Sequence, residues 1–309
     1  MEEKSKLLVI SLAVILIGLP FVTASGQSAD DSTAGSVFGF GTDAKSLAMG
    51  GAFVAVADNY SATYWNPAGL TQFSGVQLGG MNLRPYGAAN FSYGGGAVTI
   101  QNFAFGASYG QLTADLGNQL GYDGDSGYSS YGETMIGGSL AYGIDFANFG
   151  ANVKSYQFEG ETGFGFDLGT LMTFDGISLG VAANDVGGTA LKGDNLSSTL
   201  KPSYRFGVAA ELLDRALVSA EYDLLGNKNN KIKAGFEILP IDQFALRGGV
   251  QVPSSGGPSF TVGAGINLAG LTVDIAWLQN NTEFASRSGA GDTLVLSAGF
   301  QFGAFGESA

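Results

Sequence analysis

Hydrophobic and polar residues alternate with a period of two over most of the chain after residue 74. Near the C-terminus, Leu294 and Leu296 lie on one face of an extended segment, while Thr293 and Ser297 lie on the other. A β-strand points successive side chains to opposite faces, so this alternation predicts strands with one apolar face. Val295 is the residue that breaks the alternation in this segment.

We count about fourteen such strands. Their predicted ranges are 75–84, 89–100, 102–112, 131–144, 146–158, 162–174, 176–187, 202–212, 215–224, 231–238, 242–252, 258–267, 271–280 and 292–303. Every second connection is a tight turn such as "QN", "DF" or "AG", whereas the others include long polar loops. A soluble β-sandwich also alternates, but it has no reason to sort its loops in this way. Outer-membrane barrels do, because their periplasmic turns are short and their outer loops long.

The sequence therefore predicts an all-β fold, a transmembrane antiparallel β-barrel of about 14 strands over residues 75–303. Aromatic residues support this prediction, since several of them fall beside the tight turns, where an interfacial belt belongs. They are Phe103, Phe146, Phe174, Phe244 and Phe302.

The N-terminal residues 1–24 read as a secretory signal peptide, with Lys4 and Lys6 ahead of an apolar run and a small residue, Ala24, at the expected cleavage site. An uncleaved membrane anchor is the alternative, but the apolar run is at the short limit for a spanning helix. Residues 304–309 remain as a C-terminal tail. Signal peptide and barrel together place the protein in the outer membrane of a diderm bacterium.

Composition excludes most catalytic chemistry. The chain has no cysteine and no histidine, so it cannot build a Ser-His-Asp triad, a thiolate nucleophile or a Cys/His zinc site. We predict no enzyme activity, no catalytic residues, no metal site and no cofactor. A net charge of −13 also argues against nucleic acid as a partner, because phosphate binding needs clustered Lys and Arg.

Residues 25–74 precede the first strand and show no regular alternation. A barrel of about 14 strands has a wide bore that would leak unless it is closed, so we predict that this segment is a hatch inside the lumen. Its motif is Trp65, Asn66, Pro67 and Ala68, in which Asn66 can cap a short helix that begins at Pro67. Tyr64 and Trp65 either fill the lumen or line a passage, and we favour filling.

The segment "DAKSLAMGGAFVAVADNYSATYWNPAGL", residues 43–70, resembles the N-terminal signature of the FadL-like superfamily of outer-membrane proteins, especially its PorV/PorQ branch. The resemblance implies a fourteen-stranded barrel with an N-terminal plug. It implies two different functions, because FadL-type members pass hydrophobic molecules whereas PorV-type members work with a protein secretion apparatus.

Gly94, Gly95 and Gly96 interrupt the second predicted strand. Glycine within a strand marks a bulge, a bend or a close approach of another backbone. One hypothesis is a kinked wall that opens laterally into the membrane. The alternative, which we favour, is that the glycines make room for the hatch.

Charged residues at predicted lumen-facing positions occur on four consecutive strands: Arg205, Glu211, Glu221, Asp223, Lys233, Glu237 and Arg247. Opposite charges on neighbouring strands can pair across the sheet. A cluster of one sign would suggest an ion-selective constriction. The mixed signs favour a structural network that stiffens the wall and anchors Asp43, Lys45 or Asp58 of the hatch.

The sequence thus predicts a plugged outer-membrane channel that passes small hydrophobic molecules when the hatch moves. The alternative is a PorV-like protein that docks secreted proteins or a secretion apparatus, and a chiefly structural barrel is a third reading. The expected partners are membrane lipid together with either a small hydrophobic ligand or secretion machinery.

Overall fold

The computed structural model describes residues 39–85, 89–114, 131–158, 160–192, 197–212, 215–225, 229–279 and 291–303. The predicted signal peptide, the first part of the predicted hatch and the C-terminal tail lie outside these ranges.

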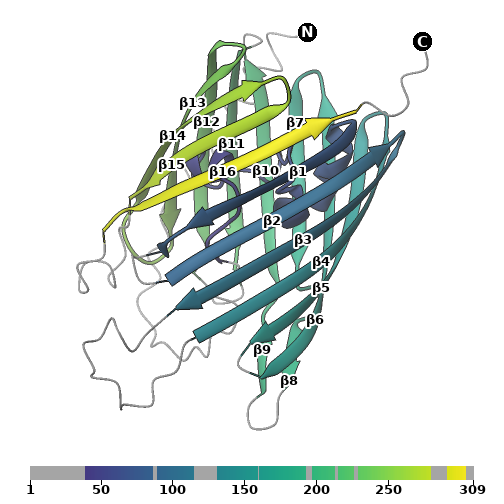
Figure 1. The fold of residues 1–309 in the computed structure, drawn as a ribbon, viewed down its shortest axis with the longest axis vertical. Coiled ribbons are helices and arrows are strands. Elements are labelled where there is room, and N and C mark those ends of the chain that lie inside the picture. Colours follow the sequence, from purple (N-terminus) through teal and green to yellow (C-terminus); the bar gives the residue numbers. More distant parts are fainter. Residues whose placement is uncertain are drawn as a thin grey trace.

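Fourteen antiparallel strands close into a barrel (Figure 1). They are β1 (Gly75–Leu83), β2 (Ala89–Ile100), β3 (Phe103–Ala114), β4 (Tyr131–Ile144), β5 (Ala147–Phe158), β6 (Glu161–Phe174), β7 (Ile177–Asn184), β10 (Ser203–Leu212), β11 (Ala216–Leu224), β12 (Lys231–Ile241), β13 (Phe244–Pro253), β14 (Ser259–Leu268), β15 (Leu271–Leu278) and β16 (Thr293–Phe302). The first strand, β1, pairs with the last, β16, so the ring is complete. The predicted fold class is confirmed.

Two short strands outside the ring correct one prediction. The segment between β7 and β10 was expected to be a loop, but it contains β8 (Thr189–Lys192) and β9 (Ser197–Leu200). They pair with each other as a hairpin, and β8 pairs with β6 where Lys192 lies opposite Thr162. Four residues are too few to show a period of two, which explains why the pattern missed both strands.

The alternation along each strand separates an outer apolar face from an inner face, as predicted. On β16, Leu294 and Leu296 are each 54% exposed, whereas Thr293 and Ser297 are buried. Val295 also points inward and is fully buried. The residue that breaks the sequence pattern therefore belongs to the packing of the lumen.

Tight turns join the strands at one end of the barrel, which we call the tight-turn end; the opposite end is the long-loop end. Asp175 and Gly176 have φ angles of 48° and 77°, and Ala269 and Gly270 have 49° and 88°. Two consecutive positive φ angles are the type I′ geometry that suits the twist of a hairpin. At this end the rings of Phe103, Phe146, Phe174 and Phe302 are exposed, at the positions expected of an aromatic belt, and Phe244 is half-buried.

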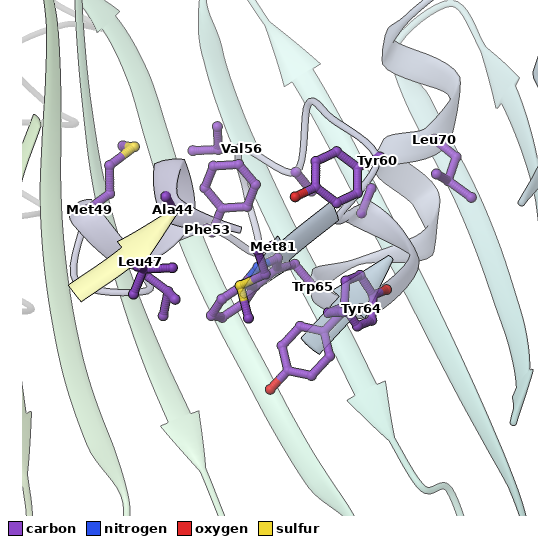
Figure 2. Packing of buried hydrophobic residues seen from close by; sticks show 14 of the residues in the cluster. Ala44, Leu47, Met49, Phe53, Val56, Tyr60, Tyr64, Trp65, Leu70 and Met81 are labelled. Atoms are coloured by element: carbon purple, nitrogen blue, oxygen red, sulfur yellow. The ribbon is translucent and has the colours of Figure 1, made fainter. Parts of the chain in front are cut away.

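Residues 39–74, called here the internal segment, lie inside the barrel (Figure 1). They contain the helices α2 (Ala44–Ala48) and α3 (Ala62–Trp65) and the 3₁₀ helix η2 (Pro67–Gln72). Figure 2 shows the core that results, in which the apolar side chains of the internal segment pack together within the barrel wall. No helix in the described part of the chain is long and apolar enough to cross a membrane.

Candidate functional site

Asn66 holds the internal segment together and ties it to the wall. Its side-chain oxygen accepts a hydrogen bond from the Ala68 N–H at 3.2 Å, which caps η2 as the sequence predicts. Its amide nitrogen donates to the carbonyl oxygens of Val54 at 2.8 Å and Thr170 on β6 at 3.1 Å. Pro67, the first residue of η2, and Ala68 are both buried. The motif is therefore a junction between two parts of the internal segment and β6.

Trp65 and Tyr64 occupy the middle of the lumen (Figure 2). Trp65 is 3% exposed, donates its indole N–H to the Thr42 carbonyl at 2.9 Å and makes edge contacts with Tyr64 and Phe53. Both rings also line a cavity of about 100 Å³ on the long-loop side, which Arg205 borders from the wall. Their burial fits a role in filling the lumen. That they line a passage stays a hypothesis.

Glu221 on β11 is a strong anchor of the internal segment. Its Oε2 accepts the backbone N–H groups of Phe53 at 2.8 Å and Val54 at 2.7 Å. Its Oε1 pairs at 2.9 Å with Lys233, whose ammonium also lies 2.6 Å from Asp223. Hydrogen bonds to an ionised acceptor are about twice as strong as neutral ones. The carboxylate thus fixes the internal segment while Lys233 offsets its charge.

Arg205 on β10 binds the internal segment in a different way. The centre of its guanidinium lies 4.9 Å from the ring centroids of both Tyr64 and Trp65. Its Nη1 faces the carbonyl oxygens of the same two residues at 3.3 and 3.4 Å. Cation–π attraction is strongest where water is excluded, and Arg205 is only 8% exposed.

A second ion-pair group lies nearer the tight-turn end. Arg247 on β13 bonds Glu237 on β12 and Asp274 on β15, each at 2.6 Å. Lys45 of the internal segment lies 3.7 Å from Glu237 and 2.6 Å from Asp58. The structure therefore brings six of the seven predicted lumen charges into contact with each other or with the internal segment. This arrangement fits mutual neutralisation of charge.

Glu211 is the exception. It has the inward register of its strand, but it lies exposed at the tight-turn end and takes part in no ion pair among the described residues. The sequence also missed two contributors. Asp274 completes the Arg247 group, and Lys154 on β5 pairs with Asp167 on β6 at 2.7 Å. Asp274 and Lys154 both occupy inward positions in the alternation of their strands. The alternation alone could therefore have placed them in the lumen.

Ionisable groups of the internal segment respond to this burial. Burial raises the pKa of Asp43 to about 6, and the nearby Asp274 adds to the rise, while hydrogen bonds from Asn59 and the Lys45 N–H oppose it. Burial disfavours the charged form of Lys45, but Asp58 and Glu237 outweigh it and hold the pKa of Lys45 above its ordinary value.

No group of acidic, histidine or cysteine side chains in the described residues is arranged to hold a metal ion.

Gly94, Gly95 and Gly96 do not interrupt the wall. Across this stretch, β2 pairs with both β1 and β3 without a shift in register. A Cβ at Gly95 would lie 3.3 Å from Thr63 Oγ1 and from the Tyr60 carbonyl oxygen. The pairing of β2 is therefore continuous across these glycines, and the close approach of the internal segment accounts for Gly95. Lateral opening stays a hypothesis.

Gly95 is one of a set of inward-facing glycines that we call the glycine ring. At each of them a Cβ atom would lie within 4 Å of residues 48–70 of the internal segment, and at most of them closer than 3 Å, where a side chain does not fit without a shift. They are Gly79, Gly95, Gly106, Gly150, Gly169, Gly180, Gly207, Gly235, Gly249, Gly263 and Gly299. The wall is shaped to the backbone of the internal segment around most of its circumference.

An apolar sector lines the lumen between the internal segment and the long-loop end. It is formed by inward side chains of β1 to β4 and β16, all buried: Met81, Leu83, Phe91, Tyr93, Leu112, Met135 and Val295. Phe40 packs on this sector, with its ring centroid 6.0 Å from that of Phe91. Lumens of water-filled barrels are polar, so this sector is unusual for an aqueous pore.

The internal segment separates spaces on its two sides. A polar cavity of about 280 Å³ lies towards the tight-turn end and is lined by Lys45, Asp58, Glu237 and Arg247 among others. The cavity of about 100 Å³ beside Trp65 lies towards the long-loop end. The two share no lining residue.

No protein-family model matches the sequence. No curated protein matches it either. Solved structures do share the fold. The toluene transporter TbuX of Ralstonia pickettii has a TM-score of 0.60 and 15% sequence identity, over 85% of this chain and 99% of that chain. The monoaromatic hydrocarbon channel CymD has a TM-score of 0.63 and 14% identity, over 85% and 98%.

The P. putida toluene transporter TodX gives a TM-score of 0.59 and 15% identity, over 85% and 99% of the two chains. These neighbours share the barrel fold that the sequence predicts. They do not distinguish a PorV/PorQ branch.

Proposed function

We propose that this protein is an outer-membrane channel for small hydrophobic molecules, closed by the internal segment, which acts as a movable hatch. The fold neighbours are named as toluene and monoaromatic hydrocarbon transporters. In this proposal residues 25–74 form the hatch and residues 75–303 the channel wall, after removal of a signal peptide.

The apolar sector carries the proposal. Burying apolar surface in a lumen gives no advantage to a channel for water or ions, but it offers a favourable environment for a molecule that leaves water. The sector faces the long-loop end, and it leads to the aromatic side chains of Tyr64 and Trp65. In this proposal a hydrophobic molecule from outside the cell passes between these apolar side chains, which are packed together and buried in the present conformation.

In this proposal passage beyond that point needs a change in the internal segment, because the segment lies between the two cavities and packs closely on the wall. Many of its attachments to the wall are single hydrogen bonds and ion pairs, such as Asn152 to the Thr63 carbonyl and Thr99 to the Leu70 carbonyl. Polar contacts of this kind exchange with water at modest net cost. No observation favours the docking of secreted proteins, and we do not propose it.

The test uses the absence of native cysteine. The Ala44 N–H donates to Ser297 Oγ at 3.1 Å, which brings α2 and β16 within reach of a disulfide. Diderm cells carrying the double variant Ala44→Cys, Ser297→Cys should take up labelled toluene only after reduction, because the bridge locks the internal segment to the wall. Each single-cysteine variant is a matched control and should take up toluene under both conditions.

Two outcomes would contradict the proposal in different ways. If cells with the unmodified protein take up toluene no faster than cells without it, the protein is not a channel for this class of molecule. If the oxidised double variant transports normally, the channel remains but the hatch does not move at α2.

A further inference from the structure

Asp43 connects three parts of the structure. Its carboxylate accepts the Lys45 N–H at 2.6 Å, which caps α2. The same carboxylate accepts hydrogen bonds from the side chains of Asn59 at 2.7 Å and Ser61 at 3.0 Å, just before α3. Its backbone N–H donates to the sulfur of Met81 on β1 at 2.9 Å (Figure 2). One residue therefore holds α2, the start of α3 and the wall together.

The wall holds two consecutive backbone amides at this point. The next N–H along the chain, that of Ala44, donates to Ser297 Oγ on β16 at 3.1 Å. Met81 and Ser297 lie opposite each other in the pairing of β1 with β16. The beginning of α2 is thus attached to one place on the wall, through the side chains of two paired residues.

The backbone of Asp43 is strained. Its φ of 75° and ψ of 137° lie outside the left-handed helical region that Asp tolerates. A residue other than glycine keeps such a conformation only where the surrounding contacts hold it, and this kind of strain is common at switch regions. Gly50 and Gly51, which follow α2, have positive φ angles of 68° and 71°. Residues 43–51, called here the α2 unit, therefore have a strained joint at one end and a glycine joint at the other.

The helix of this unit lies between the two cavities. Leu47 borders the cavity of about 100 Å³, and Lys45 borders the cavity of about 280 Å³. Neither α3 nor η2, both fully described, contributes a residue to the lining of the larger cavity. Of the three helices of the internal segment, α2 is therefore the one whose displacement would join the two spaces.

Met81 belongs to the apolar sector as well as to this attachment. It is 6% exposed and packs in the same cluster as the other side chains of the sector. A thioether sulfur is a weak hydrogen-bond acceptor, and the unbranched methionine side chain adapts readily to new neighbours. An apolar molecule that packs into the sector thus meets a side chain that moves at small cost, and the movement takes the acceptor away from the Asp43 N–H.

We propose that Met81 is a positioning residue that couples ligand binding to the hatch: a small hydrophobic molecule in the apolar sector displaces its sulfur from the Asp43 N–H, which releases the α2 unit. The inference deepens the proposed function and rests on it for the ligand and for the movement of the hatch. A ligand shifts such an equilibrium by binding the released state more tightly. In that state the ligand occupies the space that the Met81 side chain has left.

Hydrogen exchange measured by mass spectrometry tests the coupling. In the unmodified protein in lipid nanodiscs, toluene should saturably accelerate exchange at the amides of residues 43–51. Met81→Leu keeps the apolar volume but lacks the acceptor. The same amides should therefore exchange about fivefold faster or more without toluene, and toluene should add little. A purely structural role of Met81 would leave the response to toluene in place.

Met135→Leu is the matched comparison. Met135 on β4 is buried in the same sector, at 2% exposure, and makes no contact with Asp43 among those described. Whatever this variant does to toluene affinity, exchange at residues 43–51 should stay slow without toluene. Equal exchange in Met81→Leu and Met135→Leu would overturn the inference. So would an undiminished response to toluene in Met81→Leu, or no response in the unmodified protein.

The two proposals can fail separately. Toluene uptake by cells without faster exchange at residues 43–51 overturns the coupling and leaves the channel. A response of these amides to toluene that depends on Met81, without toluene uptake, supports the coupling and contradicts the channel.

Discussion

The carboxylate of Glu221, on the barrel wall, lies 2.8 Å from the backbone nitrogen of Phe53 in the middle of the internal segment. The same oxygen accepts the next N–H along the chain, at 2.7 Å. A wall side chain thus supplies the hydrogen bonds that a short irregular segment cannot make for itself. The position of the internal segment depends on the wall as much as on its own helices.

Glu221→Ala should release this part of the internal segment without preventing barrel formation. The two charge-assisted bonds are each worth about 1.5–3 kcal/mol, and Lys233 would retain Asp223 and the Gly51 carbonyl as partners. We expect much faster hydrogen exchange at the amides of Phe53 and Val54, measured by mass spectrometry, with the heat-modifiable gel mobility of a folded barrel retained. Glu211→Ala is the control, and equal exchange in the two variants would contradict the anchoring role.

Gly180→Ala tests the glycine ring. A Cβ on this β7 residue would overlap the Val54 carbonyl and the Ala55 backbone. Overpacking of this kind costs about 1–3 kcal/mol, so the variant should unfold at a lower temperature and show more frequent open events in planar bilayers. Gly138→Ala on β4 is matched, because Gly138 is exposed and nothing lies within 4 Å of its Cβ position. Similar behaviour of the two variants would show that the fit is loose.

Arg247→Gln should be strongly destabilising. It leaves Glu237 and Asp274 close together and buried without their shared cation, and breaking a buried ion pair costs about 3–5 kcal/mol. Arg215→Gln removes an exposed pair with Asp242 and should cost about 0–1 kcal/mol. Denaturant unfolding in detergent measures both changes.

Combining Arg247→Gln with Arg205→Gln should loosen the internal segment further, and unchanged stability and conductance in the double variant would contradict the network.

Asp43 should make stability fall as pH rises through the acidic range. Its pKa is about 6 in the folded protein against 3.8 for the ordinary group, so the folded state binds more protons between these values. Its contribution is therefore most favourable below pH 4, declines up to about pH 6 and is constant above. Thermal unfolding of Asp43→Asn, compared with the unmodified protein from pH 4 to 7.5, should show the variant gaining relative stability up to about pH 6. A constant difference would exclude this effect.

Much of the barrel could be predicted from the sequence because two independent signals agree along it. The alternation predicts which side chains face outward and which face the lumen. Turn residues such as Asp175-Gly176 and Ala269-Gly270 predict where strands end. The hairpin of β8 and β9 was missed because it is short. Asn66 was correctly predicted as a cap, since capping depends on neighbours two residues away.

The lumen was harder to predict. Pairs such as Glu221 with Lys233 follow from adjacency of strands, but Lys154 with Asp167 was overlooked although the same rule applies. From the sequence, Gly94, Gly95 and Gly96 were interpreted as a local feature of β2. The structure shows that Gly95 belongs to the glycine ring, whose members occur on many strands where the internal segment contacts the wall. Which wall positions contact the internal segment depends on the three-dimensional path of residues 39–74. A local sequence pattern does not reveal that path.

The closure of β1 against β16 determines the order of assembly. The first and last strands of the wall can pair only after β16 has been synthesised, and residues 39–74 immediately precede the first of them. Because the glycine ring fits the internal segment closely, we expect the strands to wrap around a segment that is already in place. Closure of the wall and enclosure of the internal segment would then be a single event in this protein.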